Sequence, residues 1–106
     1  MGLDVYLKDK KEIVFDANIT HNLGEMASAC GVYYACWRPE EINCTKAKHI
    51  LPMLKDGIKV LKADPAHYRK FDSPNGWGLY DDFLPWLEIY AEACENNPEA
   101  KIKVSR

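Results

Sequence analysis

The stretch LDVYLKDKKEIVFDAN, residues 3–18, decides the fold because it holds two strand patterns joined by a short polar turn. In residues 3–8 the side chains Leu3, Val5 and Leu7 alternate with more polar ones, and this period of two is typical of a half-buried strand. Residues 9–11 read Asp-Lys-Lys, and residues 12–18 bring Ile13, Val14 and Phe15 in succession. We therefore predict two strands that pair as an antiparallel hairpin.

Three helical patterns follow the hairpin. Residues 21–37, 45–63 and 79–95 each carry apolar side chains at spacings of three and four. We expect Thr20 or Asn22 to cap the first helix and Thr45 to cap the second. Pro52 lies deep inside the second pattern, where proline removes a helical hydrogen bond, so we expect a kink there. Residues 66–71 are expected to add a short helical turn.

The end of the chain returns to a strand pattern, since Ile102 and Val104 alternate with polar residues over residues 100–106. The predicted order is β-β-α-α-(short α)-α-β. The simplest architecture for this order is an α+β domain spanning residues 1–106, in which three main helices pack on one face of a three-stranded antiparallel sheet. We expect the last strand to lie beside the first.

Composition narrows the classes of function. The chain of 106 residues has 14 basic and 16 acidic side chains, and this balance does not favour a general binder of nucleic acid. It has four cysteines but no CxxC pair, no segment like a signal peptide and no run long enough to span a membrane. We therefore expect a cytoplasmic protein with reduced thiols. Neither the histidines nor the cysteines show the ligand spacing of a zinc site, so no metal or cofactor is expected.

The first candidate binding segment is Asn18-Ile19-Thr20-His21-Asn22, at the junction between a strand and a helix. Free backbone N–H groups at a helix N-terminus favour anions. Asn18, Thr20 and Asn22 supply uncharged hydrogen-bonding groups, and His21 titrates near neutral pH. The simpler interpretation is that Thr20 or Asn22 only caps the helix and His21 packs at the surface.

Two further segments offer aromatic and charged groups. Arg38 is suited to gripping a phosphate or carboxylate, with Trp37 as a stacking wall; alternatively, Trp37 belongs to the core and Arg38 braces the loop through Glu40 or Glu41. In Ser73-Pro74-Asn75-Gly76-Trp77-Gly78 the glycines favour a tight turn. There, Asn75 and Trp77 are candidates for hydrogen bonding and stacking, unless Trp77 is a hydrophobic plug that pins the loop.

Catalysis has little support in the sequence. Fingerprints of nucleophile elbows, phosphate-binding loops and dinucleotide sites do not occur. Two arrangements stay open: a thiol–imidazole pair such as Cys44 with His49, and a small hydrolase or transferase that uses His21, Glu40 and Glu41. We assign no catalytic residue.

Several runs resemble a family of small proteins of unassigned activity that bacteriophages, prophages and bacteria encode. The runs are MGLDVYL at residue 1, NITHNLGEMA at residue 18, WRPEE at residue 37, SPNGWG at residue 73, YAEAC at residue 90 and the ending KVSR. Members share an Asn-x-Thr-aromatic-Asn pattern, matched here by Asn18, Thr20, His21 and Asn22, in which tyrosine can stand at the His21 position. The resemblance therefore implies stacking or hydrogen bonding at that position, not general-base or metal chemistry.

From these observations we expect a phage-type accessory protein that binds a small polar or nucleotide-like ligand without catalysis. The alternative is a protein-interaction or inhibitor protein that acts on a host factor, with exposed aromatics as anchors. A second copy of the chain is a further candidate partner.

Overall fold

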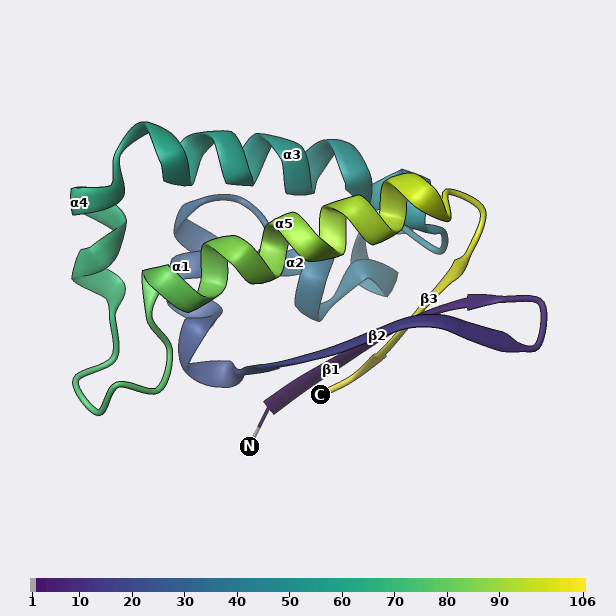
Figure 1. The fold of residues 1–106 in the computed structure, drawn as a ribbon, viewed down its shortest axis with the longest axis horizontal. Coiled ribbons are helices and arrows are strands. Elements are labelled where there is room, and N and C mark those ends of the chain that lie inside the picture. Colours follow the sequence, from purple (N-terminus) through teal and green to yellow (C-terminus); the bar gives the residue numbers. More distant parts are fainter. Residues whose placement is uncertain (1) are drawn as a thin grey trace.

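The computed structural model describes residues 2–106, in which helices pack on one face of a three-stranded antiparallel sheet (Figure 1). This is the predicted α+β architecture, with the predicted order of strands and helices. No helix in these residues is both long and apolar enough to cross a membrane. The elements, with η for 3-10 helices, are β1 (Gly2–Asp9), β2 (Glu12–Thr20), η1 (His21–Leu23), α1 (Gly24–Ala29), α2 (Tyr33–Trp37), η2 (Pro39–Ile42), α3 (Ala47–Ala63), α4 (Pro65–Tyr68), η3 (Arg69–Phe71), α5 (Tyr80–Asn96) and β3 (Lys101–Ser105).

The sheet has the strand order β2-β1-β3, with the first strand in the centre. Both neighbours of β1 are antiparallel to it, as predicted for the hairpin and for the last strand. Leu3, Val5 and Leu7 are fully buried under the helices, whereas the alternate residues of β1 are half-buried on the opposite face. The register slips between Leu7 and Lys8, which places a β-bulge near the turn of the hairpin.

The outer edge of β3 is covered by the segment that leads into α3. The Ile102 N–H donates to the Thr45 carbonyl, and the Ala47 N–H donates to the Ala100 carbonyl, both at 2.9 Å. Thr45 is therefore not the helix cap, and that prediction is wrong. Instead, His49 Nδ1 accepts the backbone N–H groups of Thr45 and Lys46 at 3.2 Å, and α3 begins at Ala47.

Helices α3 and α5 lie side by side and supply most of the helical core (Figure 1). Leu54 and Leu61 of α3 and Leu87 of α5 are fully buried in the core. Lys55 and Lys62 of α3 form ion pairs at 3.0 Å with Glu95 and Glu88 of α5, which link the exposed sides of the two helices. α3 continues unbroken through Pro52, whose ring is exposed.

The predicted helix over residues 21–37 is wrong in one respect, because it is divided into η1, α1 and α2. Gly31 has a φ of +86°, a conformation that L-residues rarely adopt, and it turns the chain between α1 and α2. The turn places Val32, fully buried, against Gly57 of α3. A Cβ on Gly57 would lie 2.2 Å from Val32 Cγ1 and 3.3 Å from the Cys30 carbonyl oxygen. The break between α1 and α2 thus coincides with a close contact between Val32 and Gly57 of α3.

Candidate functional site

The first junction is a capped turn and not the start of a long helix. Thr20 Oγ1 accepts the backbone N–H of Asn22 at 3.2 Å, and the helical segment that follows, η1, has only three residues. η1 runs directly into α1, and this helical run ends at Ala29 instead of Trp37, so its macrodipole is that of a much shorter helix than the one predicted. The Asn18 side chain donates to Asp4 Oδ1 at 2.8 Å across the sheet.

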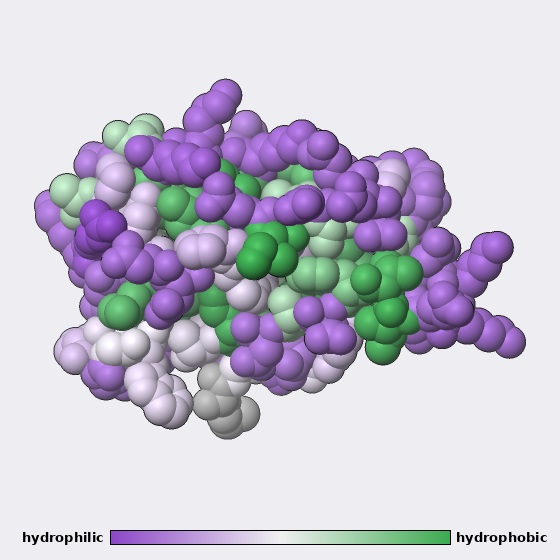
Figure 2. Space-filling model, viewed as in Figure 1, coloured by the Kyte–Doolittle hydropathy of each residue, from purple (hydrophilic) through white to green (hydrophobic). Residues whose placement is uncertain are grey.

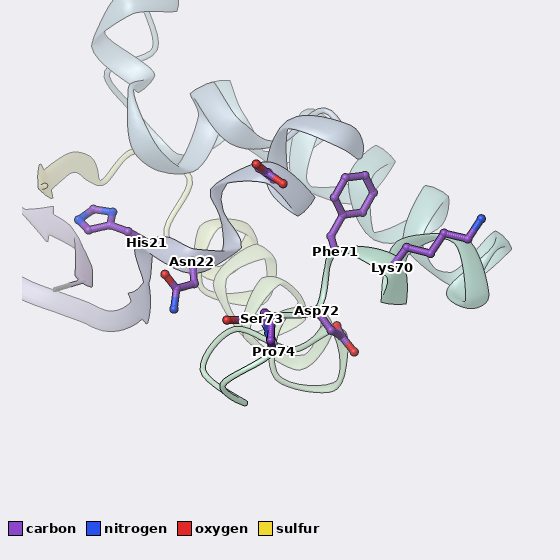
Figure 3. Close-up of a pocket in the computed structure, with 8 residues that line it drawn as sticks. His21, Asn22, Lys70, Phe71, Asp72, Ser73 and Pro74 are labelled. Carbon is purple, nitrogen blue, oxygen red and sulfur yellow. The ribbon is translucent and has the colours of Figure 1, made fainter.

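His21 is tied to a buried tryptophan. Trp37 Nε1 donates to His21 Nδ1 at 2.9 Å. An indole nitrogen only donates, so Nδ1 of His21 is the acceptor and the proton of the neutral ring sits on Nε2. In Figure 3 the His21 ring points away from Ser73 and Pro74. This geometry suits a hydrogen-bonding role for His21.

Trp37 belongs to the core, so the expectation that it stacks on a ligand is wrong. Its side chain is 3% exposed, and its face is covered by the Tyr33 ring, at 5.5 Å between centroids and 11° between planes. The α2 helix turns the two rings to the same side because they are four residues apart. The alternative interpretation of Trp37, as a core residue, fits the structure.

Arg38 braces its own loop. Its Nε donates to the Tyr33 hydroxyl at 3.2 Å and its Nη1 to Glu41 Oε2 at 2.7 Å. These two hydrogen bonds raise the pKa of Arg38 above its usual value, with the Tyr33 bond the larger cause. Glu40 instead pairs with Arg106 at 2.7 Å. Its pKa is lowered, first by a backbone hydrogen bond and then by Arg106. The two adjacent glutamates thus point to different partners.

The second junction is a tight turn that presents Trp77 to solvent. Asn75 Oδ1 accepts both the Ser73 hydroxyl at 2.6 Å and the Trp77 N–H at 2.9 Å. Gly76 and Gly78 have φ values of +78° and +116°, which glycine alone adopts without strain. The Trp77 side chain is 72% exposed. It is a surface group and not the plug that the alternative interpretation required.

The two junctions, which lie 55 residues apart in sequence, meet in space. Asn22 Nδ2 donates to the Trp77 carbonyl at 2.8 Å. The chains approach so closely that a Cβ on Gly78 would lie 2.9 Å from Cβ of Asn22. Asn18, Thr20 and Asn22 therefore lie close to Trp77. Trp37 contacts the first junction only through His21 and is buried, and Arg38 forms its hydrogen bonds within its own loop.

Two open hollows flank this contact between the junctions. The smaller, of about 360 Å³, brings Asn18 and Thr20 beside the Trp77 indole. The larger, of about 510 Å³, lies between Asn22 and the segment that leads into the second junction (Figure 3). The smaller hollow is lined by Gly2, Asn18, Thr20 and Trp77; the larger is lined by His21, Asn22, Glu25, Lys70, Phe71, Asp72, Ser73 and Pro74.

The lining of the larger hollow was largely missed by sequence reasoning. Glu25 lies on α1, at a position that looks like an ordinary solvated residue of a helix first turn. Asp72 precedes the predicted segment by one residue, and its Oδ1 accepts the Tyr80 N–H at 2.7 Å, which ties the second junction to α5. Lys70 is the basic side chain of the lining, and in Figure 3 its amino group points outward. The hollow thus offers more acceptors than cations.

The thiols give no sign of an activated nucleophile. Burial raises the pKa of Cys30 to about 11 and that of Cys94 to about 12, and it raises the pKa of Cys36 strongly as well. The suggested pairing of Cys44 with His49 is not formed, because His49 Nδ1 accepts backbone N–H groups and Cys44 Sγ contacts the Ile42 carbonyl at 3.7 Å. In residues 2–106 no group of three or more His, Cys, Asp or Glu side chains is placed to hold a metal ion.

Comparisons with protein-family models, with curated proteins and with solved structures gave no match. Function is therefore argued from the geometry of the two joined junctions.

Proposed function

We propose that the chain is a non-catalytic binding module for a small polar ligand with a flat ring, of nucleoside or nucleotide type. The observation that carries the proposal is the hydrogen bond from Asn22 to the Trp77 carbonyl. It holds the exposed Trp77 indole beside the smaller hollow, while Asn22 itself lines the larger one, and the volumes of about 360 and 510 Å³ fall in the range of ligand sites.

Each side of the contact suits a different part of such a ligand. The Trp77 indole offers a stacking face, and Asn18 and Thr20 beside it offer amide and hydroxyl groups for a base edge. On the other side, Glu25 and Asp72 offer acceptors for sugar hydroxyls. Because those carboxylates repel a phosphate, we expect a nucleoside to bind at least as well as its nucleotide.

Thermal-shift and calorimetric titrations with adenosine, AMP, cyclic AMP and the guanine counterparts test this proposal. We expect stabilisation by at least one of these ligands, and a loss of binding in Trp77→Ala. The matched control is Tyr34→Ala, which removes another exposed aromatic side chain, 49% exposed, from α2 outside both hollows. If none of these ligands stabilises the folded protein, or if both variants bind equally well, the proposal is refuted.

A second candidate is a protein-interaction module acting on a bacterial host factor, as the resemblance to phage proteins suggests. The exposure of Trp77 favours it, since a 72% exposed tryptophan on a braced turn is the type of side chain that anchors interfaces. A stoichiometric complex purified from bacterial lysate, lost in Trp77→Ala and kept in Tyr34→Ala, would support this candidate. A complex that survives Trp77→Ala would exclude the junction as its interface.

A further inference from the structure

One face of the sheet is turned away from the helices. Leu3, Val5 and Leu7 of β1 point toward the helices and are fully buried. The residues between them point the other way, and residues directly opposite each other on neighbouring strands share a face. We call this second surface the open face. Its charged and aromatic side chains are Asp4, Tyr6 and Lys8 of β1, Asp16 of β2, and Lys101 and Lys103 of β3.

Lysines stand directly opposite one another at the hairpin end of the open face. Lys101 of β3 pairs with Lys8 of β1 on one side and with Lys46, the residue before α3, on the other. Lys103 lies two residues further along β3 and faces the same way. We call these four side chains the lysine cluster. Like charges directly opposite each other destabilise a sheet, so the cluster costs the free protein stability and a bound anion would relieve the repulsion.

The lysine cluster is only partly neutralised by other residues. At one end, Glu99 approaches Lys46 at 3.5 Å but Lys48 more closely, at 2.8 Å. The seven ion pairs formed by residues 2–106 include none of the other three lysines of the cluster. The acidic side chains of the open face are Asp4 and Asp16, and Asp4 already accepts a side-chain amide at 2.8 Å. The overall balance of 14 basic and 16 acidic residues therefore does not reveal the local excess of positive charge.

The turn of the hairpin adds two lysines next to the cluster. Lys10 and Lys11 connect β1 to β2, and Lys10 has a φ of +58°. Asparagine and glycine are the residues that two-residue hairpin turns favour at positive φ, so a lysine here is at odds with the local preference. Asp9 and Glu12 flank the turn, but they pair one step beyond Lys8 and therefore lie on the opposite face of the hairpin. Figure 2 shows hydrophilic side chains that project from the surface at this end, at the right of the view.

Tyr6 lies in the centre of the open face, between Lys103 on β3 and Asp16 on β2. Its side chain is half-buried, and none of the aromatic pairs within residues 2–106 includes its ring. Lys8 follows two residues later on the same strand and the same face. A ring on a flat sheet with lysines beside it is an arrangement that binds single strands of nucleic acid, because bases stack on the ring and the lysines meet phosphates.

The occupant that fits the open face is anionic, extended and supplied with flat rings. The lysine cluster calls for anionic groups repeated along the ligand, and Tyr6 offers a stacking surface between them. A duplex provides the charge but keeps the faces of its bases stacked inside the helix. A lipid surface provides the charge but no rings. Single-stranded nucleic acid provides both, with a phosphate at each residue and bases that are free to stack.

We propose that the open face binds single-stranded nucleic acid, with phosphates at the lysine cluster and one base stacked on Tyr6. Contacts of this kind do not read base edges, so the binding is tolerant of sequence and sensitive to salt. With one phosphate each at Lys8, Lys101 and Lys103, the logarithm of the association constant falls against the logarithm of the salt concentration with a slope of about −2. The proposal does not rest on the proposed ligand site, because neither hollow includes Tyr6 or the lysine cluster.

Fluorescence anisotropy with a labelled oligothymidylate of about ten nucleotides, titrated at about 50 to 200 mM salt, tests the proposal. We expect saturable binding to the parent protein and weaker binding of a duplex of the same length. Lys101→Glu should weaken the binding by at least about tenfold, because it replaces attraction by repulsion. Lys101→Gln should reduce the magnitude of the salt slope by about 0.7. Tyr6→Leu keeps an apolar side chain but loses the ring, and should weaken the binding by about fivefold or more.

Controls separate the open face from other surfaces. Lys59→Glu makes the same charge change at an exposed lysine of α3 that takes part in none of the ion pairs of residues 2–106, and it should leave binding unchanged. Lys101→Glu should melt no lower than the parent protein, since it sets opposite charges beside Lys8 and Lys46, so that lost binding is not lost folding.

Three results would overturn the proposal directly. They are the absence of oligothymidylate binding at about 50 mM salt, a duplex that binds as tightly as the single strand, and equal binding by Lys101→Glu and Lys59→Glu. Loss of binding in Trp77→Ala, with binding kept in Lys101→Glu, would place the nucleic acid at the two junctions and would overturn it as well.

Discussion

Replacement of Gly57 by alanine tests the contact that divides the first helical region. In an unobstructed helix interior this change stabilises by about 1 kcal/mol. In α3, however, the added Cβ would lie 2.2 Å from Val32 Cγ1 and 3.3 Å from the Cys30 carbonyl oxygen. Val32 is fully buried, so it can move away from the new methyl group only by repacking the core around it. We expect Gly57→Ala to lower the free energy of unfolding by about 1–3 kcal/mol, the usual cost of overpacking a core.

A double-mutant cycle makes the expectation specific. Val32→Ala alone removes two buried methyl groups and should cost about 1–3 kcal/mol. In the double variant the new methyl at position 57 occupies space that Val32 vacated. The combined loss should therefore fall short of the sum of the single losses by about 1–2 kcal/mol.

Urea unfolding followed by far-ultraviolet circular dichroism measures these free energies, with the m-value as a check on two-state behaviour. Gly24→Ala is the matched control. A Cβ there would meet Tyr33 Cε1 at an ordinary 3.8 Å, and the helical φ of −58° suits alanine, so we expect no loss. A neutral or stabilising Gly57→Ala, or strictly additive losses in the cycle, would refute the packing of the Gly31 turn against α3.

Three further outcomes follow from the structure. His21→Ala leaves the buried Trp37 N–H without its partner and should cost about 1–3 kcal/mol in denaturant unfolding; an unchanged stability would contradict the hydrogen bond. Gly78→Ala strains a φ of +116° and should cost about 1–3 kcal/mol, detectable as a lower melting temperature; no change would mean the junction relaxes freely. The Cys30 and Cys94 thiols have pKa values of about 11 and about 12 in the folded protein, above the usual value of 9.0. Below pH 9.0 they should leave the free energy of unfolding unchanged. Above it they should lower this free energy, because only the unfolded chain then loses these protons. Unfolding titrations from neutral to alkaline pH should show a shallower decline in Cys30→Ala than in the parent chain.

The sheet was predictable because its patterns are local and short. In residues 3–8 and 100–106 apolar and polar side chains alternate, which indicates directly which face of the strand is buried. The short polar turn Asp-Lys-Lys at residues 9–11 predicts that the first two strands pair as a hairpin. The break at Gly31 was not predictable in the same way. Apolar residues keep their helical spacing across it, and the reason for the break is a contact with Gly57, on a different helix. A tertiary contact of this kind leaves no trace in the periodicity of the segment itself.

The candidate site was predictable only in part, for a related reason. Amides and glycines mark junctions, so Asn18, Thr20, Asn22 and Trp77 were found from residue type. Residue type does not tell which aromatic side chain faces water: Trp37 and Trp77 were both candidates for stacking on a ligand, but Trp37 is buried and Trp77 is exposed. Glu25 also lines the larger hollow, although its residue type and its place in the first turn of a helix do not distinguish it from an ordinary solvated glutamate.

The central position of β1 has a consequence for how the chain folds during synthesis. Asp4 pairs with Ser105 of β3, so one side of β1 has no pairing strand until every helix has been translated. The β1–β2 hairpin can form early, but the other edge of β1 stays vacant and the nascent sheet is incomplete. Translation delivers about 5–20 residues per second, so this vacancy lasts for seconds on the ribosome. The sheet is therefore completed late. The native structure can form only after β3 has emerged from the ribosome.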